Sequence, residues 1–344
     1  MSTSKPFGRV TAKDVAEHAG VSRSLVSMYL GGNKKVWLSE NTKQRIDEVV
    51  KTLGYRPNTL ARALRNGKTN TIGLLMGGIA DPFGGVLAEA IMDEVEKHGY
   101  RLFIAVTRFD RERERQALLN MLGHQIDGII YTLSADFDED FFRRFESSSC
   151  PILLTENHPE IDLDSVCYDL RPGLRGAIRH LENLGCRSIL CQAGCFDRTE
   201  EQLKSLTGEF GCKLDTYRWS TVTNTREEFI EKILRDRPDG ILVQGKLGLD
   251  KTAAFPLGYR PRIIKLGMLS QLVPAPDGVI HLPFRSWVEK MVEVLVGQIE
   301  NPSAGKIRVE IPTEFVPPDR VPELMRIQSE ENSFSMYGTT NGGR

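Results

Sequence analysis

From Thr71 onward, short apolar and β-branched runs alternate with longer stretches whose apolar residues recur at helical spacing. The runs that predict strands are TIGLLM, RLFIAV, DGIIYT, PILLTE, SVCYD, RSILCQ, DGILVQ, RIIKLGM and GVIHL. Such alternation is typical of βαβ units in a parallel, doubly wound sheet. About six strands fill one such sheet, so the pattern predicts an α/β body of two Rossmann-like lobes, with a ligand cleft at the carboxyl ends of the strands.

The order of these runs also predicts how the body divides. A break is expected near residues 159–165, and the amphipathic segment 284–300 is expected to return to the first lobe. The helical stretches 84–98 and 111–123 are candidate dimer surfaces of the first lobe. The polar end of the chain, residues 321–344, is expected to be disordered.

The first 57 residues have a different pattern, which predicts three short helices. Thr11 is a good N-cap residue, and Asp14 places a carboxylate in the first turn, where the helix dipole favours it. Gly20 supplies a sharp turn, and Ser22 caps the next helix. In that helix we expect one set of side chains to face inward and another outward, namely Val21, Leu25, Val26 and Leu30 against Arg23, Ser24, Ser27 and Met28.

A third helix is predicted from its N-cap Ser39 to about Leu53, where Gly54 ends it and Pro57 prevents continuation. Three helices in about 50 residues bury little surface, so this headpiece alone is expected to be marginally stable. Two helices joined by a tight turn form the helix-turn-helix of many DNA-binding domains.

Charge divides the chain in the same way. Residues 1–68 contain 13 Lys and Arg against five acidic residues, a net charge of +8, whereas the remainder carries −9 and the whole chain −1. Neutralising phosphates releases counterions and drives association with nucleic acid. The basic headpiece is therefore expected to meet a polyanion.

Three segments together resemble the LacI/GalR family of repressors, VTAKDVAEHAGVSRSLVS, LSENTKQRIDEVVKTLGYRPN and LARALRNGKTNTIGLLM. Their order and spacing are far more specific than a generic helix-turn-helix match. The resemblance implies a nucleoid-associated transcriptional repressor that binds a palindromic operator in double-stranded DNA as a homodimer. It also implies a regulatory core of periplasmic-binding-protein type, which binds a small effector and needs no cofactor.

In this family the second helix enters the major groove, which implies base contacts for Arg23, Ser24 and Met28. Arg23 is suited to a guanine, and Met28 to apolar contact such as a thymine methyl. The family usually has Arg at the position of Met28, so the operator is expected to differ from the common one. Phosphate contacts are implied for Thr11, Ser22, Thr42 and Tyr55.

The loop GGNKKVW is about two residues longer than is usual in the family, so Lys34, Lys35 and Trp37 are candidates for further contacts with the DNA backbone. The alternative is a solvated polar surface without DNA contact. The same alternative applies to each of the other headpiece residues.

Residues 58–66, NTLARALRN, predict one or two helical turns, too short to be stable alone in water. In family members two hinge helices fold together in the minor groove, where a leucine wedges into the central base step. The resemblance gives Leu64 this role, Ala61 a close contact between hinge helices, and Arg65 a minor-groove or phosphate contact, with Asn58 as N-cap of the same DNA-binding segment. The predicted division is a helix-turn-helix domain at 8–57, a hinge at 58–68, a first lobe at 69–163 plus 284–316, a second lobe at 164–283 plus 317–327, and a disordered tail at 328–344.

The effector residues are where the sequence departs most from the family. After the first strand the usual NPFF is Asp81-Pro82-Phe83-Gly84, and the usual ligand-binding arginine aligns with Gln202. An Asn-Asp pair aligns with Gly245 and Lys246, and the aspartates of GFDD with Met268 and Leu269. The candidate effector residues are therefore Asp81, Phe83, Arg198, Gln202 and Lys246.

Two explanations of these departures stay open. In the first, Lys246 with Arg198 and Gln202 favours an anionic effector, a sugar phosphate or sugar acid. In the second, small-molecule sensing has been lost, and a protein partner or the abundance of the regulator controls it. A rival class is a ligand-binding or interaction module whose basic arm never contacts DNA.

Composition and motifs argue against other classes. The chain is 40% hydrophobic and 26% charged, and no apolar run approaches the roughly 20 residues that span a bilayer, so no membrane partner is expected. The start MSTSKPFGRVTAKD lacks secretory features, so a cytoplasmic location is expected. GxGxxG, P-loop, GxSxG and HExxH motifs are absent from the sequence, so an enzyme is not expected.

The six cysteines are expected to be reduced thiols, because a chain of this size does not need a disulfide framework. Cys186, Cys191 and Cys195 cluster near His180, but their spacing matches no zinc pattern. Small buried hydrophobic side chains are the default interpretation, and metal or redox sensing is the alternative.

Overall fold

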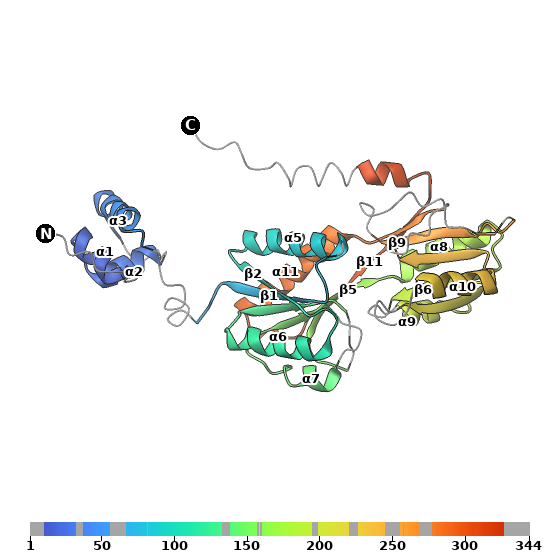
Figure 1. The fold of residues 1–344 in the computed structure, drawn as a ribbon, viewed down its shortest axis with the longest axis horizontal. Helices are drawn as coiled ribbons and strands as arrows, with labels where there is room; N and C mark the ends of the chain where they lie inside the picture. The colour runs from blue at the N-terminus through green and yellow to red at the C-terminus, as the bar shows by residue number, and fades with distance from the viewer. Residues whose placement is uncertain are drawn as a thin grey trace. The chain divides into compact units, whose positions relative to one another are not determined.

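The structure is a computed structural model of the 344-residue chain. It describes residues 10–31, 37–55, 67–80, 82–132, 138–156, 158, 160–194, 199–219, 226–244, 255–256, 258–267 and 277–326. The chain forms two compact units, Met1–Thr69, called the headpiece below, and Asn70–Arg344, called the body (Figure 1).

The described part of the headpiece contains three helices, α1 (Ala12–Ala19), α2 (Arg23–Leu30) and α3 (Glu40–Leu53). Apolar side chains from all three form one small core, whose buried members are Val15, Ala16, Ala19, Val26 and Ile46. The three helices predicted from the sequence are confirmed, and Thr11, Ser22 and Ser39 are their N-caps.

The first lobe of the body is built on a six-stranded parallel sheet with the order β11-β5-β4-β3-β1-β2. Its strands are β1 (Thr71–Met76), β2 (Arg101–Val106), β3 (Gly128–Tyr131), β4 (Ile152–Leu154), β5 (Asp164–Asp169) and β11 (Arg308–Pro312). Its helices are α5 (Pro82–Lys97), α6 (Arg111–Gly123), α7 (Glu139–Arg143) and α11 (Phe284–Glu300). Leu74 packs with α5 and α11, and Leu75 with α6 and α7, so both faces of the sheet are covered.

The second lobe has a six-stranded sheet with the order β12-β10-β9-β8-β6-β7, in which only the β10–β12 pair is antiparallel. Its strands are β6 (Ser188–Gly194), β7 (Lys213–Trp219), β8 (Gly240–Gln244), β9 (Arg262–Gly267), β10 (Val279–His281) and β12 (Glu314–Val316). Its helices are α8 (Arg171–Asn183), α9 (Thr199–Ser205) and α10 (Arg226–Asp236). Helices α8 and α9 share one core, and α10 covers the opposite face.

An Asp-Gly pair fixes the third strand in both lobes. Asp127 accepts a hydrogen bond from Asn70 N at 2.8 Å before β1, and Asp239 accepts from Arg187 N at 2.8 Å and Ser188 N at 2.9 Å at the start of β6. The glycines that follow, Gly128 and Gly240, lie against helix side chains at distances that leave no room for a Cβ. The DGII and DGIL segments thus perform one structural task in both lobes.

Three chain segments pass between the lobes, from β5 to α8, from β10 to α11 and from β11 to β12. Helix α11 joins the core of the first lobe, as predicted. In that core Trp287 Nε1 donates to Val166 O at 2.9 Å, and the Trp287 ring lies 4.8 Å from that of Tyr168. Tyr168 also packs on the core of the second lobe, so it bridges both.

The two-lobed α/β architecture is confirmed, but some details of the prediction are wrong. The predicted break at 159–165 and boundary at 163 fall one strand too early, since β5 belongs to the first sheet. The predicted first-lobe segment 284–316 runs too far, because β12 lies in the second sheet. Both lobe boundaries depend on which distant strands pair with each other, and the pattern of apolar runs along the sequence does not reveal that pairing.

The end of the described chain also differs from expectation. Residues 321–326 are helical, and Val321 is buried against Val279 and Val316. Val321, with the partly buried Leu324 and Met325, thus docks this short helix on the second lobe. The predicted tail at 328–344 lies outside the described residues.

No helix in the described ranges is long and apolar enough to cross a membrane. The described cysteines, Cys150, Cys167, Cys186, Cys191 and Cys212, are free thiols. Burial raises the pKa of Cys150 to about 12 and that of Cys212 to about 11. Within the same ranges no three His, Cys, Asp or Glu residues are grouped as a metal site, and Cys195 lies outside them.

Candidate DNA-binding and effector sites

Thr11 and Asp14 form a capping box at the start of α1. Asp14 Oδ2 accepts from Thr11 N at 2.8 Å and from Thr11 Oγ1 at 2.7 Å, and Asp14 N donates to Thr11 Oγ1 at 3.4 Å. The predicted N-cap is confirmed. The Thr11 hydroxyl already donates to Asp14. The phosphate contact of Thr11 stays a prediction, and it requires that hydroxyl to donate to a phosphate oxygen in place of Asp14.

A left-handed glycine and a serine cap set the position of α2. Gly20 has φ +62°, a conformation that residues with a Cβ adopt only at a cost. Two residues later, Ser22 Oγ accepts from Leu25 N at 3.1 Å. The Ser22 hydroxyl is exposed and keeps its hydrogen for an outside acceptor such as a phosphate oxygen.

The outward face of α2 is narrower than predicted. Arg23 and Ser24 are exposed and Val26 is buried, as expected, but Ser27 and Met28 are half-buried. Eight residues of helix have only two turns, so side chains near the end of α2 partly cover the core. Arg23 and Ser24, next to the Ser22 cap, therefore form the accessible end of the helix.

Contacts to α3 hold α2 in place. Tyr29 Oη donates to Asp47 Oδ2 at 2.9 Å, and desolvation and this hydrogen bond raise the pKa of Tyr29. Thr42 Oγ1 lies 2.8 Å from Ser39 Oγ within the cap of α3, and Tyr55 is half-buried against the headpiece core. Thr42 and Tyr55 therefore have a structural role, and their phosphate contacts stay predictions.

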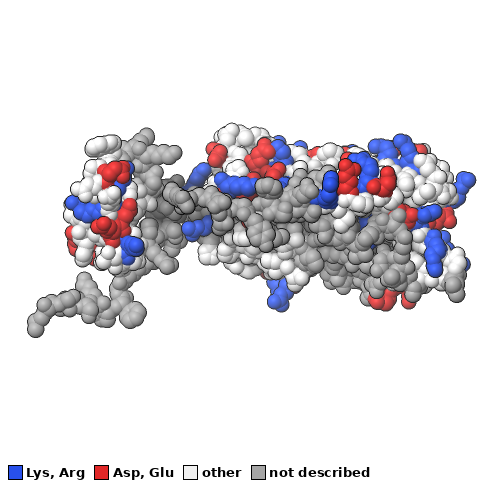
Figure 2. All heavy atoms as spheres, turned by 90° about the horizontal axis from the view of Figure 1, so that it is seen from above, with Lys and Arg blue, Asp and Glu red and all other residues white. Residues whose placement is uncertain are grey.

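The positive charge of the headpiece lies mainly outside its helices. Residues 10–31 and 37–55 contain five Lys and Arg and five Asp and Glu, so the surplus comes from the remaining segments. Figure 2 shows acidic and basic side chains mixed on the described surface. Trp37 is 89% exposed beside the predicted basic loop. The hinge residues Asn58, Ala61, Leu64 and Arg65 lie outside the described residues.

Close backbone packing explains the Gly84 that replaces an expected aromatic. A Cβ at Gly84 would overlap the carbonyl oxygen of Gly78, and a Cβ at Gly77 would overlap the ring of Phe109. Phe83 packs edge-to-face with Phe284 at 6.2 Å. Phe83 is thus part of an aromatic cluster, and its contact with an effector stays a prediction; Asp81 lies outside the described residues.

Gln202 holds the segment that crosses from β5 to α8. Its Oε1 accepts from Leu170 N at 2.6 Å, and its Nε2 donates to Tyr168 O at 3.3 Å. A side chain that the family resemblance places in the effector site is therefore bonded to the backbone between the lobes. Arg198 and Lys246, with Gly245, Met268 and Leu269, lie outside the described residues.

Two features of the body were not predicted from the sequence. Arg171 contacts Asp169 and Glu310, a residue 139 positions away, and no local pattern reports that contact. Lys265 is 2% exposed in β9, on a strand whose neighbours Ile264 and Leu266 are also buried. The lysine within the apolar run RIIKLG is the local sequence signal of this buried charge.

Two family models match the chain. That of bacterial regulatory proteins of the lacI family matches residues 11–58, and that of periplasmic binding proteins and sugar-binding domains of the LacI family matches residues 69–205. Catabolite control protein A of Staphylococcus aureus is 31% identical over 242 residues, 68% of this chain and 73% of that protein. The chain belongs to the LacI family.

A further relative and a solved structure are similar to the chain. The HTH-type transcriptional regulator PtxS of Pseudomonas putida is 32% identical over 207 residues, so the chain spans 60% of the length of that relative. The crystal structure of the Lac repressor dimer bound to operator and the anti-inducer ONPF matches with a TM-score of 0.75 at 20% identity, over 90% of this chain and 98% of that one. The chain thus resembles an HTH-type transcriptional regulator in sequence and shares the fold of the Lac repressor.

Proposed function

We propose that this LacI-family protein is a DNA-binding transcriptional regulator, and specifically a repressor of carbohydrate or sugar-acid metabolism genes. It acts in the cytoplasm at the nucleoid, binds a palindromic operator as a homodimer, and responds to a small anionic effector. The proposal assigns it no enzymatic activity and no cofactor.

The observation that carries the proposal is the accessible end of α2. Arg23 and Ser24 are exposed directly after the Ser22 cap, and the buried Val26 anchors the opposite face of the helix. A guanidinium presented by a rigid helix is suited to the O6 and N7 acceptors of guanine in the major groove. The flanking basic segments supply phosphate contacts without sequence preference.

Exposed apolar residues of the first lobe support a homodimer. Strand β2 is an edge strand, and its Phe103 and Val106 are 46% and 40% exposed. Further exposed apolar side chains stand on the two predicted dimer helices, Val86 and Met92 on α5 and Leu119 on α6. An unpaired edge with apolar side chains promotes association, and a symmetric dimer that covers it matches the two halves of a palindrome.

Positive residues of the second lobe support an anionic effector. Arg198 and Lys246 follow the carboxyl ends of β6 and β8 in sequence, where ligands of parallel sheets bind.

The second candidate is a regulator without a small-molecule effector, controlled by a protein partner or by its own abundance. Gln202 favours it, because its amide bonds to the backbone of Leu170 and Tyr168. Gly84 favours it too, because packing against Gly78 leaves no room for a second aromatic side chain.

Selection of bound sequences from a random DNA pool tests the proposed repressor. We expect one palindromic sequence to be enriched and to be retained in gel shifts at rising salt. Equal binding of all sequences, lost steeply with salt, would indicate a nonspecific basic arm and refute the proposal.

A thermal-shift screen of the full chain against sugars, sugar acids and sugar phosphates tests the effector class. We expect stabilisation by an anionic member and a smaller effect in Lys246→Met, which removes the charge and keeps an unbranched side chain. A flat response to every compound would favour the second candidate, and equal responses of both proteins would remove Lys246 from the site.

A further inference from the structure

Hydrogen bonds at the lobe junction tie two crossing segments together. The carbonyl oxygen of Asp169 accepts from Thr313 N at 3.0 Å and from Thr313 Oγ1 at 2.9 Å. Asp169 ends β5 in the first sheet, and Thr313 separates β11 of the first sheet from β12 of the second. A change in the arrangement of the two lobes would have to bend the chain at these crossing segments, since they are the few residues between the packed lobes.

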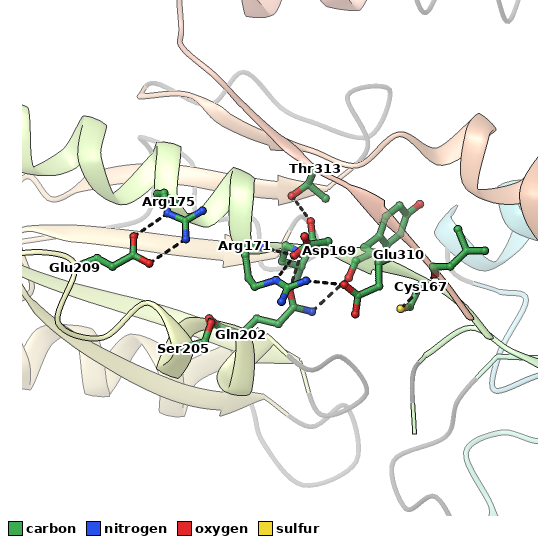
Figure 3. Close-up of polar contacts among 12 residues, drawn as sticks. Cys167, Asp169, Arg171, Arg175, Gln202, Ser205, Glu209, Glu310 and Thr313 are labelled. Carbon is green, nitrogen blue, oxygen red and sulfur yellow. Dashed lines mark hydrogen bonds and ion pairs between the residues drawn. The ribbon is translucent and has the colours of Figure 1, made fainter. Parts of the chain in front are cut away.

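Arg171, the first residue of α8 in the second lobe, reaches back to the first lobe. Its Nε donates to Asp169 Oδ1 at 2.6 Å, and its Nη2 donates to Glu310 Oε2 at 2.6 Å. The Arg171 amide also donates to Asp169 Oδ1, at 3.0 Å. Figure 3 shows the guanidinium between the two carboxylates, with Glu310 reaching it from β11.

This contact differs from the other ion pairs of the body. Between described residues, the remaining pairs each join two groups of the same lobe, whereas Arg171 joins the second lobe to two carboxylates of the first. The hydrogen bond and charge of Asp169, with a smaller effect of Glu310, raise the pKa of Arg171. A shared cation with fixed donors favours one relative placement of its two partners.

We propose that Arg171 is a positioning residue: its contact with Glu310 holds the two lobes in one arrangement and thereby sets the affinity of the repressor for DNA. The inference rests on the proposed function, since a lobe arrangement acts on DNA only in a dimer whose headpieces bind an operator. Half-exposed ion pairs contribute little to folding. The equilibrium between two lobe arrangements, however, is sensitive to a small energetic contribution, because the two populations depend only on the difference in free energy between the two states.

The same helix offers a matched control. Arg175, one turn after Arg171, donates from Nε and Nη2 to Glu209 at 2.7 Å and 2.9 Å. The exposed fractions are similar, 39% and 38% for this pair against 43% and 45% for Arg171 and Glu310. Both Arg175 and Glu209 belong to the second lobe. Loss of their contact therefore removes an Arg–Glu ion pair of similar exposure but leaves the contact between the lobes intact.

Hydrogen exchange of the full chain, measured without DNA, tests the contact. In Arg171→Gln, Glu310→Gln and the double variant, we expect exchange in segments 165–171 and 309–314 to rise about two- to fivefold, the range expected for loss of a half-exposed ion pair. The double variant should exchange no faster than Arg171→Gln alone. Arg175→Gln should leave both segments unchanged. About 1 M salt should raise exchange in the wild type, since the Debye length there is about 3 Å.

The affinity for the selected operator tests the functional half. We expect the operator affinity of Arg171→Gln to differ from that of the wild type by about two- to fivefold, while that of Arg175→Gln matches it. Three results would overturn the inference: unchanged exchange in Arg171→Gln, the same rise in Arg175→Gln, or faster exchange with unaltered operator affinity. Failure to select any operator would instead refute the proposed function, while the exchange measurement would still report on the lobe contact.

Discussion

The carbonyl oxygen of Gly78 lies so close to Gly84 that a Cβ at position 84 would overlap it. The contact holds the segment after β1 against the first turn of α5. Gly85, the next residue, is less restricted, because its Cβ would meet Ile79 O at an ordinary 3.8 Å. The aromatic side chain expected at position 84 is therefore excluded by backbone packing.

These neighbouring glycines give a matched pair of substitutions. Gly84→Ala should destabilise the body by about 1–3 kcal/mol, the usual cost of forcing atoms into a filled site. Gly85→Ala should leave the stability unchanged or raise it by about 0.5–1 kcal/mol, because alanine suits a helix better than glycine. Urea denaturation of both variants measures the difference. Equal stabilities would show that the segment after β1 yields to the added methyl group.

The strands that sequence analysis missed share one property. β7, β11 and β12 are all edge strands, and β7 and β11 contain mixed polar sequences, KLDTYRW and RVEIP. Central strands of a parallel sheet are covered on both faces and need continuous apolar runs, which is why β1, β3 and β8 were predictable. Edge strands tolerate polar residues, and their pairing depends on distant segments.

The same distinction applies to the sites. The caps Thr11, Ser22 and Ser39 were predictable because each bonds to a residue three positions away. The resemblance placed Gln202 in an effector site, but its bonds to Leu170 and Tyr168 depend on the packing of α9 against the lobe junction. The Arg171–Glu310 contact depends on the order of strands in the sheet and lay beyond any local pattern.

Different residues should determine the sequence specificity and the overall affinity for DNA. Arg23→Lys keeps the charge but loses the two-pronged guanine contact, so preference for one base should fall by about 1–3 kcal/mol with the salt dependence unchanged. Lys34→Gln with Lys35→Gln should weaken all sequences alike and reduce the slope of log affinity against log salt by about two. Gel shifts with the selected operator and its single-base variants measure both. If the double variant of Lys34 and Lys35 lost the base preference instead, these assignments would be reversed.

Asp164 gives a prediction about pH. Its side chain is 1% exposed, and Oδ1 accepts from Gln298 Nε2 at 3.0 Å and from Ile307 N at 2.8 Å. Burial raises the pKa of Asp164 above its usual value, more than the hydrogen bonds and Lys306 lower it. The folded protein therefore holds this proton more tightly than the unfolded chain, so the contribution of Asp164 to stability is largest at low pH and falls as pH rises through the folded pKa.

Asp164→Asn removes this titration. The free energy of unfolding of the wild type, relative to the variant, should begin to fall as pH rises past about 4, the ordinary pKa of an aspartate, and should level off above the raised pKa of the folded protein. Only the trend with pH matters, because a constant offset between the proteins reflects altered hydrogen bonding. Denaturation at several pH values supplies the comparison. A difference that stays constant, or grows with pH, would mean that Asp164 is not held with a raised pKa.

Phe103 and Leu184 distinguish a dimer surface from ordinary apolar exposure. They are 46% and 43% exposed, but Phe103 lies on edge strand β2 of the first lobe and Leu184 follows α8 in the second. Phe103→Lys should convert the dimer to monomers and lose operator binding, because a charge would be buried in the interface and half-sites are held in pairs. Leu184→Lys should remain dimeric and bind DNA normally. Sedimentation of both variants at micromolar concentration measures their oligomeric state. A Phe103→Lys protein that remains dimeric would show that the dimer interface does not include the β2 edge.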